Sequence, residues 1–194
     1  MSRSIKLKRG FDIRLEGTAE KRLAGTVSPV IFGVKPVDFP GLIPKLDVRP
    51  GDEVRAGTSL FHDKIRPDIR FTSPVSGKVI SVERGERRRI LEVVVEKNDE
   101  EHEEFGKSDP GKLSPDQIKE QLLRSGLWPA IRQRPYHIVA DPNVVPKSLF
   151  ISGFDTAPLA PDYDFIMENT PVSFFQTGIN ALLRLTKGRV NLVL

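Results

Sequence analysis

The sequence predicts a protein of mixed α+β and α/β class with two domains: a small β-barrel or sandwich over residues 1–100, then the beginning of an α/β domain over residues 101–194. Turn-forming residues interrupt short apolar runs between 43 and 96, which is typical of compact all-β domains. The acidic, polar stretch at 98–108 predicts a boundary. Beyond it, the order of strand, helix and strand predicts a βαβ unit with a parallel sheet.

The N-terminal region is predicted to form edge-like strands. Apolar residues alternate at Ile5 and Leu7, and again from Phe11 to Leu15, which indicates half-buried strands. In the barrel region, turns are expected at residues 49–52, 56–58, 73–74, 76–77 and 84–85.

A basic cluster follows the last of these turns. It consists of Arg84, Arg87, Arg88 and Arg89, and the strand-like run 90–95 comes directly after it. This order predicts a hairpin with the four arginines at its tip, where charges are commonly only solvated. The functional alternative is docking against an acidic partner or lipid head groups.

The second region opens with a polar stretch and a helix. His102 lies among glutamates, but consecutive residues rarely converge on one ion, so we expect a solvated linker and no metal site. Ser114, Pro115 and Gln117 then have the spacing of a capping box with proline at the first helical position.

Gly126 is expected to end this helix, and Trp128 beside Pro129 is predicted to pack between the domains. A strand at 148–152, a second helix and a strand at 190–194 complete the βαβ unit. Two strands alone would leave a parallel sheet badly exposed, so we expect the chain to be a piece of a longer protein.

Composition excludes several kinds of chemistry. The chain has no cysteine, which removes disulfides, thiol nucleophiles and thiolate-held zinc or iron–sulfur clusters. Its 30 basic and 26 acidic residues give a net charge of +4, which does not predict a nucleic-acid partner. No apolar run approaches the ~20 residues of a membrane-spanning helix, and no signal-peptide core is visible. We expect a cytoplasmic or peripheral protein.

Two segments resemble the half-motifs of biotinyl and lipoyl carrier domains. Residues 48–60 follow V-x-x-G-D-x-V-x-x-G-x-x-L, and residues 73–79 follow S-P-x-x-G-x-V. The resemblance implies a barrel-sandwich hybrid. Where a carrier places its modified lysine, this sequence has Arg66, which cannot form the amide to lipoate or biotin, and Lys64 is out of register. We therefore expect a carrier-type barrel without an attached group.

A wider set of segments resembles the A subunit of the sodium-translocating NADH:quinone reductase. The matching segments are residues 8–13, 48–64, 71–85, 122–136, 148–152 and 155–159. The resemblance implies a peripheral subunit at the cytoplasmic face of the bacterial inner membrane, in a complex that oxidises NADH, reduces a quinone and exports sodium. It implies a role in assembly, with the membrane B subunit as a partner and a share in quinone binding. This chain alone is expected to have no catalytic activity.

Two alternatives stay open: the C subunit of an Rnf-type electron-transport complex, and a biotin or lipoyl carrier. Neither G-x-G-x-x-G nor G-x-x-x-x-G-K-[ST] occurs, and the loop at 155–171 has no glycine, so the sequence predicts no dinucleotide or FMN site. We expect no cofactor and no metal on this chain. Quinone is expected as a ligand of the complex, and flavins and iron–sulfur clusters on other subunits.

Five further residues have both a functional and a structural interpretation. His62 and His137 could serve in proton transfer, which is a common role of histidine, but neither has an obvious acidic partner, so structural or surface roles are predicted. Phe174 and Phe175 could line a quinone pocket, but their helical spacing predicts core positions. Asp155 follows a strand, where α/β proteins place functional groups, and a turn or helix cap is the alternative.

Overall fold

The computed structural model describes residues 15–17, 20–23, 25–99, 101–155, 157 and 159–193. The strands predicted at 5–7 and 11–15 lie outside the described residues, except for Leu15, which belongs to no strand.

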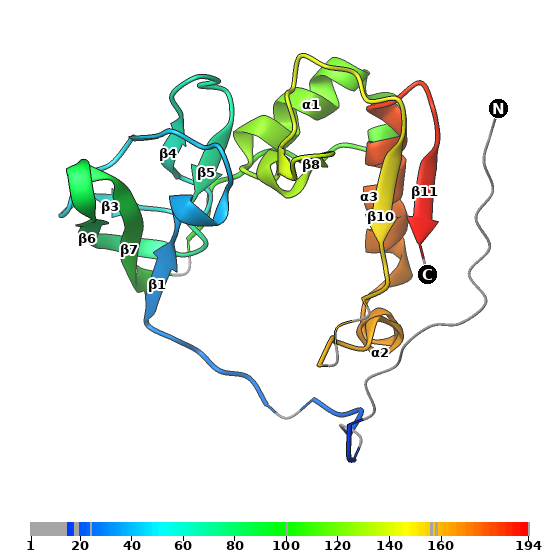
Figure 1. Ribbon diagram of the computed structural model, residues 1–194, viewed down its shortest axis with the longest axis horizontal. Helices are drawn as coiled ribbons and strands as arrows, with labels where there is room; N and C mark the ends of the chain where they lie inside the picture. Colours follow the sequence, from blue (N-terminus) through cyan, green and yellow to red (C-terminus); the bar gives the residue numbers. More distant parts are fainter. Residues whose placement is uncertain are drawn as a thin grey trace.

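Strands dominate the N-terminal half. In chain order they are β1 (Ile31–Val34), β2 (Pro44–Leu46), β3 (Glu53–Val54), β4 (Ser59–Asp63), β5 (Arg70–Thr72), β6 (Ser76–Arg84) and β7 (Ile90–Asp99). All neighbouring pairs are antiparallel, and they form one sheet of order β1-β7-β6-β3 and another of order β2-β4-β5. The predicted β fold is therefore confirmed, as two sheets rather than one closed barrel (Figure 1).

Complete burial of a few side chains explains why such short strands hold together. Leu60 and Phe61 of β4, Val79 of β6, and Val93 and Val95 of β7 have no exposed surface. Val93 and Val95 show the period of two that a half-buried strand requires. We call this N-terminal unit the barrel and these residues its core.

An aromatic cluster extends the core toward the C-terminal half. Phe61 stacks on Phe71 with ring centroids 4.8 Å apart, and Phe71 meets Phe39 edge to face at 4.5 Å. Each such pair adds about 0.5–1.5 kcal/mol beyond the burial of its area. The Arg132 guanidinium lies 4.7 Å from the Phe39 ring centroid, so the cluster links the two halves.

The polar segment after β7 is attached to the barrel. His102 forms a parallel bridge with Ala56, and the Glu103 backbone N–H donates to the Ala56 carbonyl at 2.8 Å. The Phe105 ring occupies the space where any side chain on Gly57 would have to go. His102 is exposed as predicted, yet the segment is bound along the barrel edge rather than forming a free linker.

The first helix, α1 (Pro115–Arg124), begins as predicted. The Gln117 N–H donates to the Ser114 hydroxyl at 3.2 Å, and the Ser114 N–H donates to the Gln117 side chain at 2.8 Å, which is a complete capping box. Gly126 follows with φ of +71°, and a Cβ there would lie 2.3 Å from the Thr72 hydroxyl. Glycine thus both ends the helix and lets it approach β5.

Short 3₁₀ helices and a small hairpin join the larger elements. They are η1 (Pro36–Asp38), η2 (Glu86–Arg88), η3 (Pro110–Lys112), η4 (Trp128–Ala130), β8 (Arg132–Gln133) and β9 (Ile138–Val139). Of these, η2 is not a regular 3₁₀ helix, because Arg87 within it has non-helical backbone angles. Trp128 is buried, donates to the Ala140 carbonyl at 2.8 Å, and joins the barrel's core cluster. Its predicted packing between the two halves is confirmed.

The C-terminal unit contains β10 (Leu149–Ser152), α2 (Tyr163–Glu168), α3 (Val172–Arg184) and β11 (Val190–Val193). β10 and β11 pair in parallel, so the predicted βαβ unit is confirmed. α2 lies within the segment that was predicted to be a loop. The sequence did not reveal this helix, because six residues are too few to show a helical period. Within the described residues, no helix is long and apolar enough to cross a bilayer.

Candidate docking surface and the carrier-type hairpin

The β6–β7 hairpin carries the predicted basic cluster at its end. Arg84, Arg87, Arg88 and Arg89 are all exposed, and none forms an ion pair with another described residue. The hairpin itself is confirmed. We call these four residues the arginine tip, and their docking role remains a prediction.

The arginine tip is a tight turn with left-handed backbone. The Arg89 N–H donates to the Glu86 carbonyl at 3.1 Å, and the central residues Arg87 and Arg88 have φ of 53° and 60°. This is the geometry of a type I′ turn, which favours asparagine and glycine. Arg84 Nη1 donates to the Arg88 carbonyl at 3.2 Å and so braces the turn.

The β4–β5 hairpin corresponds to the hairpin that bears the modified lysine in carriers. Arg66 Nε lies 3.0 Å from Oδ2 of the buried Asp63, and Arg66 Nη1 makes a longer contact of 3.5 Å with the Val139 carbonyl. The other carboxylate oxygen of Asp63 accepts from the Ile65 N–H at 3.1 Å. Lys64 is exposed. The hairpin is therefore held against the C-terminal half, and no acceptor lysine stands at position 66.

The expectation that His62 lacks an acidic partner is wrong. Its Nδ1 lies 2.6 Å from Asp47 Oδ1, and the Ser59 hydroxyl donates to Asp47 Oδ2 at 2.6 Å. The antiparallel pairing of β2 with β4 brings Asp47 beside these residues. The sequence did not reveal this contact, because it depends on the register between the two strands. His137 is exposed and lies in the β8–β9 turn with φ of 55°.

The expectation of a core position for Phe174 is also wrong. Its exposed fraction is 72%, whereas Phe175 is half-buried. The helix α3 lies beside η3, α1 and β11, and among the described residues these elements leave part of its apolar surface uncovered. Asp155 Oδ1 accepts from the Ala157 N–H at 2.9 Å, which agrees with the turn that was the alternative to a functional role.

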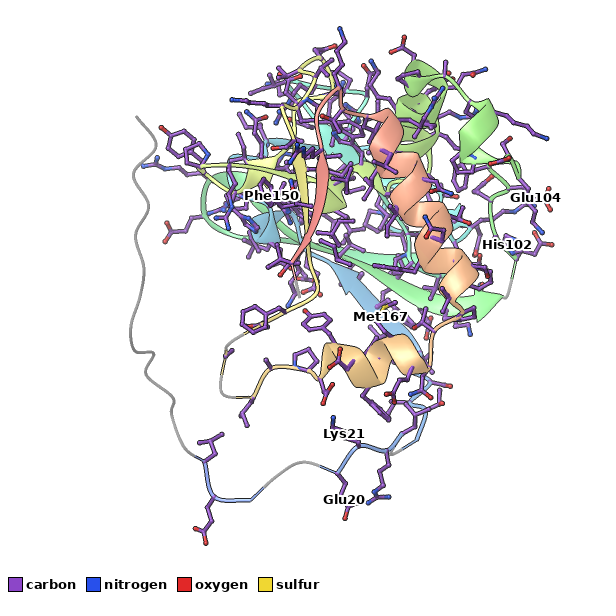
Figure 2. All side chains as sticks on the ribbon, turned by 90° about the vertical axis from the view of Figure 1, so that its right-hand side faces the viewer. Glu20, Lys21, His102, Glu104, Phe150 and Met167 are labelled. Carbon is purple, nitrogen blue, oxygen red and sulfur yellow. The ribbon has the colours of Figure 1, made fainter. Side chains whose placement is uncertain are left out.

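An ion pair between distant segments was missed by sequence reasoning. Lys21 Nζ lies 2.6 Å from Asp162 Oδ2, and Figure 2 shows Lys21 beside α2. The hydrogen bond from Lys21 lowers the pKa of the Asp162 carboxyl, and the same bond raises the pKa of Lys21. No local pattern signals such a pair.

No three potential metal ligands converge among the described residues, and the expectation of no metal stays a prediction.

Two family profiles match consecutive parts of the chain. The NqrA N-terminal barrel-sandwich hybrid domain matches residues 5–98, and the NqrA second alpha/beta domain matches residues 113–194. These matches agree with the two sheets of the barrel and with the βαβ unit, and they confirm the predicted fold class.

Curated relatives share one name, that of the A subunit of the Na(+)-translocating NADH-quinone reductase. The Pseudomonas aeruginosa protein is 36% identical over 186 residues, which cover 94% of this chain and 42% of the relative. The Yersinia pseudotuberculosis protein is 37% identical over 192 residues, with coverage of 96% and 42%. The chain thus spans less than half the length of these relatives. It belongs to the family of the A subunit of the Na(+)-translocating NADH-quinone reductase.

Proposed function

We propose that this chain serves as the assembly part of the A subunit in a respiratory Na(+)-translocating NADH-quinone reductase. The two consecutive family matches, together with the names of the relatives, carry this proposal. In this proposal the chain has two domains that divide near residue 100. It lies at the cytoplasmic face of the bacterial inner membrane, with the other subunits of the complex as partners.

The arginine tip is the proposed docking element. It presents positive charge that forms no ion pair with the described residues, on a braced turn, whereas the barrel behind it has a fully buried apolar core. A charged, preorganised end suits contact with an acidic surface, because little side-chain and backbone freedom is lost on docking. We propose that it faces the membrane-embedded part of the complex, where the B subunit lies.

We assign no redox step to this chain. It has no cysteine, so it cannot hold a thiolate-ligated cluster. Among the described residues, the Asp47 carboxylate beside His62 accepts its other side-chain hydrogen bond from the Ser59 hydroxyl. We propose that flavins and iron–sulfur clusters belong to other subunits. Quinone would bind to the assembled complex, with this chain contributing to its site.

The carrier alternative has little support in the hairpin geometry. Arg66 is engaged by Asp63 and by the Val139 carbonyl, so the tip of that hairpin is occupied. Intact mass decides the matter: the unmodified mass is expected for the wild type and for Lys64→Arg alike. An added biotin or lipoyl group that disappears in Lys64→Arg would contradict our proposal.

The assembly role is tested by affinity purification of the tagged full-length protein from detergent-solubilised native membranes. We expect flavin-containing membrane partners to co-purify, with sodium-stimulated NADH:quinone reduction. Replacement of all four tip arginines by alanine should lower the yield of the complex, and the difference from the wild type should shrink at higher salt, because salt screens the exposed charges. A colourless protein without partners or activity would contradict the proposed place in this complex.

A further inference from the structure

We propose that the acidic surface contacted by the arginine tip is the lipid bilayer itself, through the phosphate-bearing head groups of anionic lipids. This inference rests on the proposed function, because it assumes that the chain works beside a membrane. It goes further by naming the chemistry of the partner and the side chains that meet it.

The first support is the charge balance at the end of the hairpin. Between the paired residues Glu83 and Glu92, four arginines stand against three acidic residues, Glu83, Glu86 and Glu92, which leaves a net charge of +1. The Glu83 carboxylate also accepts a hydrogen bond from Ser81 at 2.6 Å. Clusters of four or more basic residues at a membrane surface are attracted to anionic lipids.

The second support is the backbone of the turn. Type I′ turns take asparagine or glycine at their centre, because other residues are strained at positive φ. Here Arg87 and Arg88 occupy both central positions, with φ of 53° and 60°. A turn needed only for chain reversal would not require arginine at these positions, so the strain points to a use for the two side chains.

A third support separates the roles of the four arginines. Arg84 donates a hydrogen bond to the Arg88 carbonyl and so acts as a positioning residue for the turn. The guanidinium groups of Arg87, Arg88 and Arg89 make no hydrogen bond or ion pair with the described residues. Guanidinium forks are suited to phosphate oxygens.

The surroundings of the tip favour a lipid surface over a protein surface. Specific protein interfaces have an apolar centre inside a polar rim. At this tip the neighbouring apolar side chain is Leu91, which is 37% exposed and packs beside Gly85. A projecting end that offers charge without an apolar centre fits a plane of phosphates.

The test is co-sedimentation of the chain with vesicles of phosphatidylglycerol and phosphatidylcholine, compared with pure phosphatidylcholine vesicles. We expect binding to the anionic vesicles only, and its loss at high salt. Arg87→Asn/Arg88→Gly should weaken the binding about 25-fold, from about fivefold for each arginine. The same variant should keep or raise the melting temperature, because Asn-Gly suits the turn, so misfolding cannot explain the loss.

Two control variants sharpen the result. Arg49→Ala/Arg134→Ala removes the same charge from exposed sites elsewhere and should leave vesicle binding unchanged. Arg87→Lys/Arg88→Lys keeps the charge and should retain most of it. Equal losses in the tip variant and the Arg49/Arg134 control would show attraction by net charge alone and would overturn the inference.

The lipid inference and the assembly proposal can fail separately. If Arg87→Asn/Arg88→Gly reduces co-purification in detergent but leaves vesicle binding unchanged, the tip docks on a protein. That result overturns the lipid inference and leaves the assembly proposal standing. If neither vesicle binding nor co-purification changes, the tip has no docking role and both ideas fail at this site.

Discussion

The barrel and the βαβ unit use similar apolar residues with different results. In the barrel, Leu60, Phe61, Ile69 and Val79 are completely buried. In the βαβ unit, α3 has no buried residue, and Phe150 on β10 is 71% exposed (Figure 2). Sequence periodicity identifies the side of an element that favours burial, but it does not say whether a covering partner is present.

This contrast predicts where the stability of the chain resides. Apolar burial contributes roughly 25 cal/mol for each Å² removed from water. The barrel gains this from both sheets, whereas α3 gains it where it meets η3, α1 and β11, and none of its residues is buried. The barrel should therefore carry most of the free energy of unfolding, and the predictions below test that difference.

The largest expected effect is in the core. Phe61→Ala removes a fully buried ring that stacks on Phe71, and it should lower the free energy of unfolding by about 3–5 kcal/mol. Phe174→Ala, which removes the same ring from an exposed position, should stay within about 0.5 kcal/mol. Urea denaturation followed by circular dichroism measures both. A similar cost at both sites would mean that the βαβ unit has a core of its own.

A smaller effect is expected where the barrel meets the C-terminal half. Arg66→Ala leaves the carboxylate of the buried Asp63 without its cation and should lower the free energy of unfolding by about 1–3 kcal/mol. Hydrogen exchange of residues 64–69 should become faster. The neighbouring change Lys64→Ala removes an exposed charge and should alter neither quantity measurably.

The helix start offers a third comparison. Ser114→Ala removes the hydroxyl of the capping box and should cost about 1 kcal/mol, measured as a shift in the urea midpoint. Ser108 is exposed and lies outside any element, so Ser108→Ala is the matched control. An unchanged midpoint for Ser114→Ala would show that packing alone fixes α1.

The smallest effect concerns the Lys21–Asp162 pair. The folded-state pKa of Asp162 is lowered, so its contribution to stability is present above the ordinary value of 3.8 and is lost as the pH falls through the lowered value. The pKa of Lys21 is raised from 10.5, so its contribution is present below 10.5 and fades as the pH rises through the raised value. Asp162→Asn should therefore lower the melting temperature slightly at neutral pH and leave it unchanged in strong acid. An equal difference at both pH values would contradict the pairing.

Much of the fold follows from local sequence signals. Gly51 and Gly57 have φ of 100° and 102°, and the capping box at Ser114 and the parallel pairing of β10 with β11 formed as predicted. These features can be predicted because they depend on residues close together in the sequence or on the periodic spacing of apolar residues. The α2 helix and the β8–β9 hairpin are too short to show a period, and sequence reasoning missed them.

The site was less predictable, because its contacts join distant segments. The arginine tip could be read from a run of residues between two strand patterns. The Asp47–His62 pair depends on the register of β2 against β4, and the contact of Arg66 with Val139 joins positions 73 residues apart. No composition or spacing rule reports such contacts.

The fixed β4–β5 hairpin also bears on protein engineering. A lipoyl or biotinyl arm works by travelling, so its tip must reach a modifying ligase and then a distant catalytic centre. Here the tip is anchored through Asp63 and the Val139 carbonyl. Arg66→Lys would supply the missing amine beside the buried Asp63 carboxylate, and an amine paired with that carboxylate should be a poor ligase substrate. Recovering a working arm would require removing this pairing as well as changing the residue.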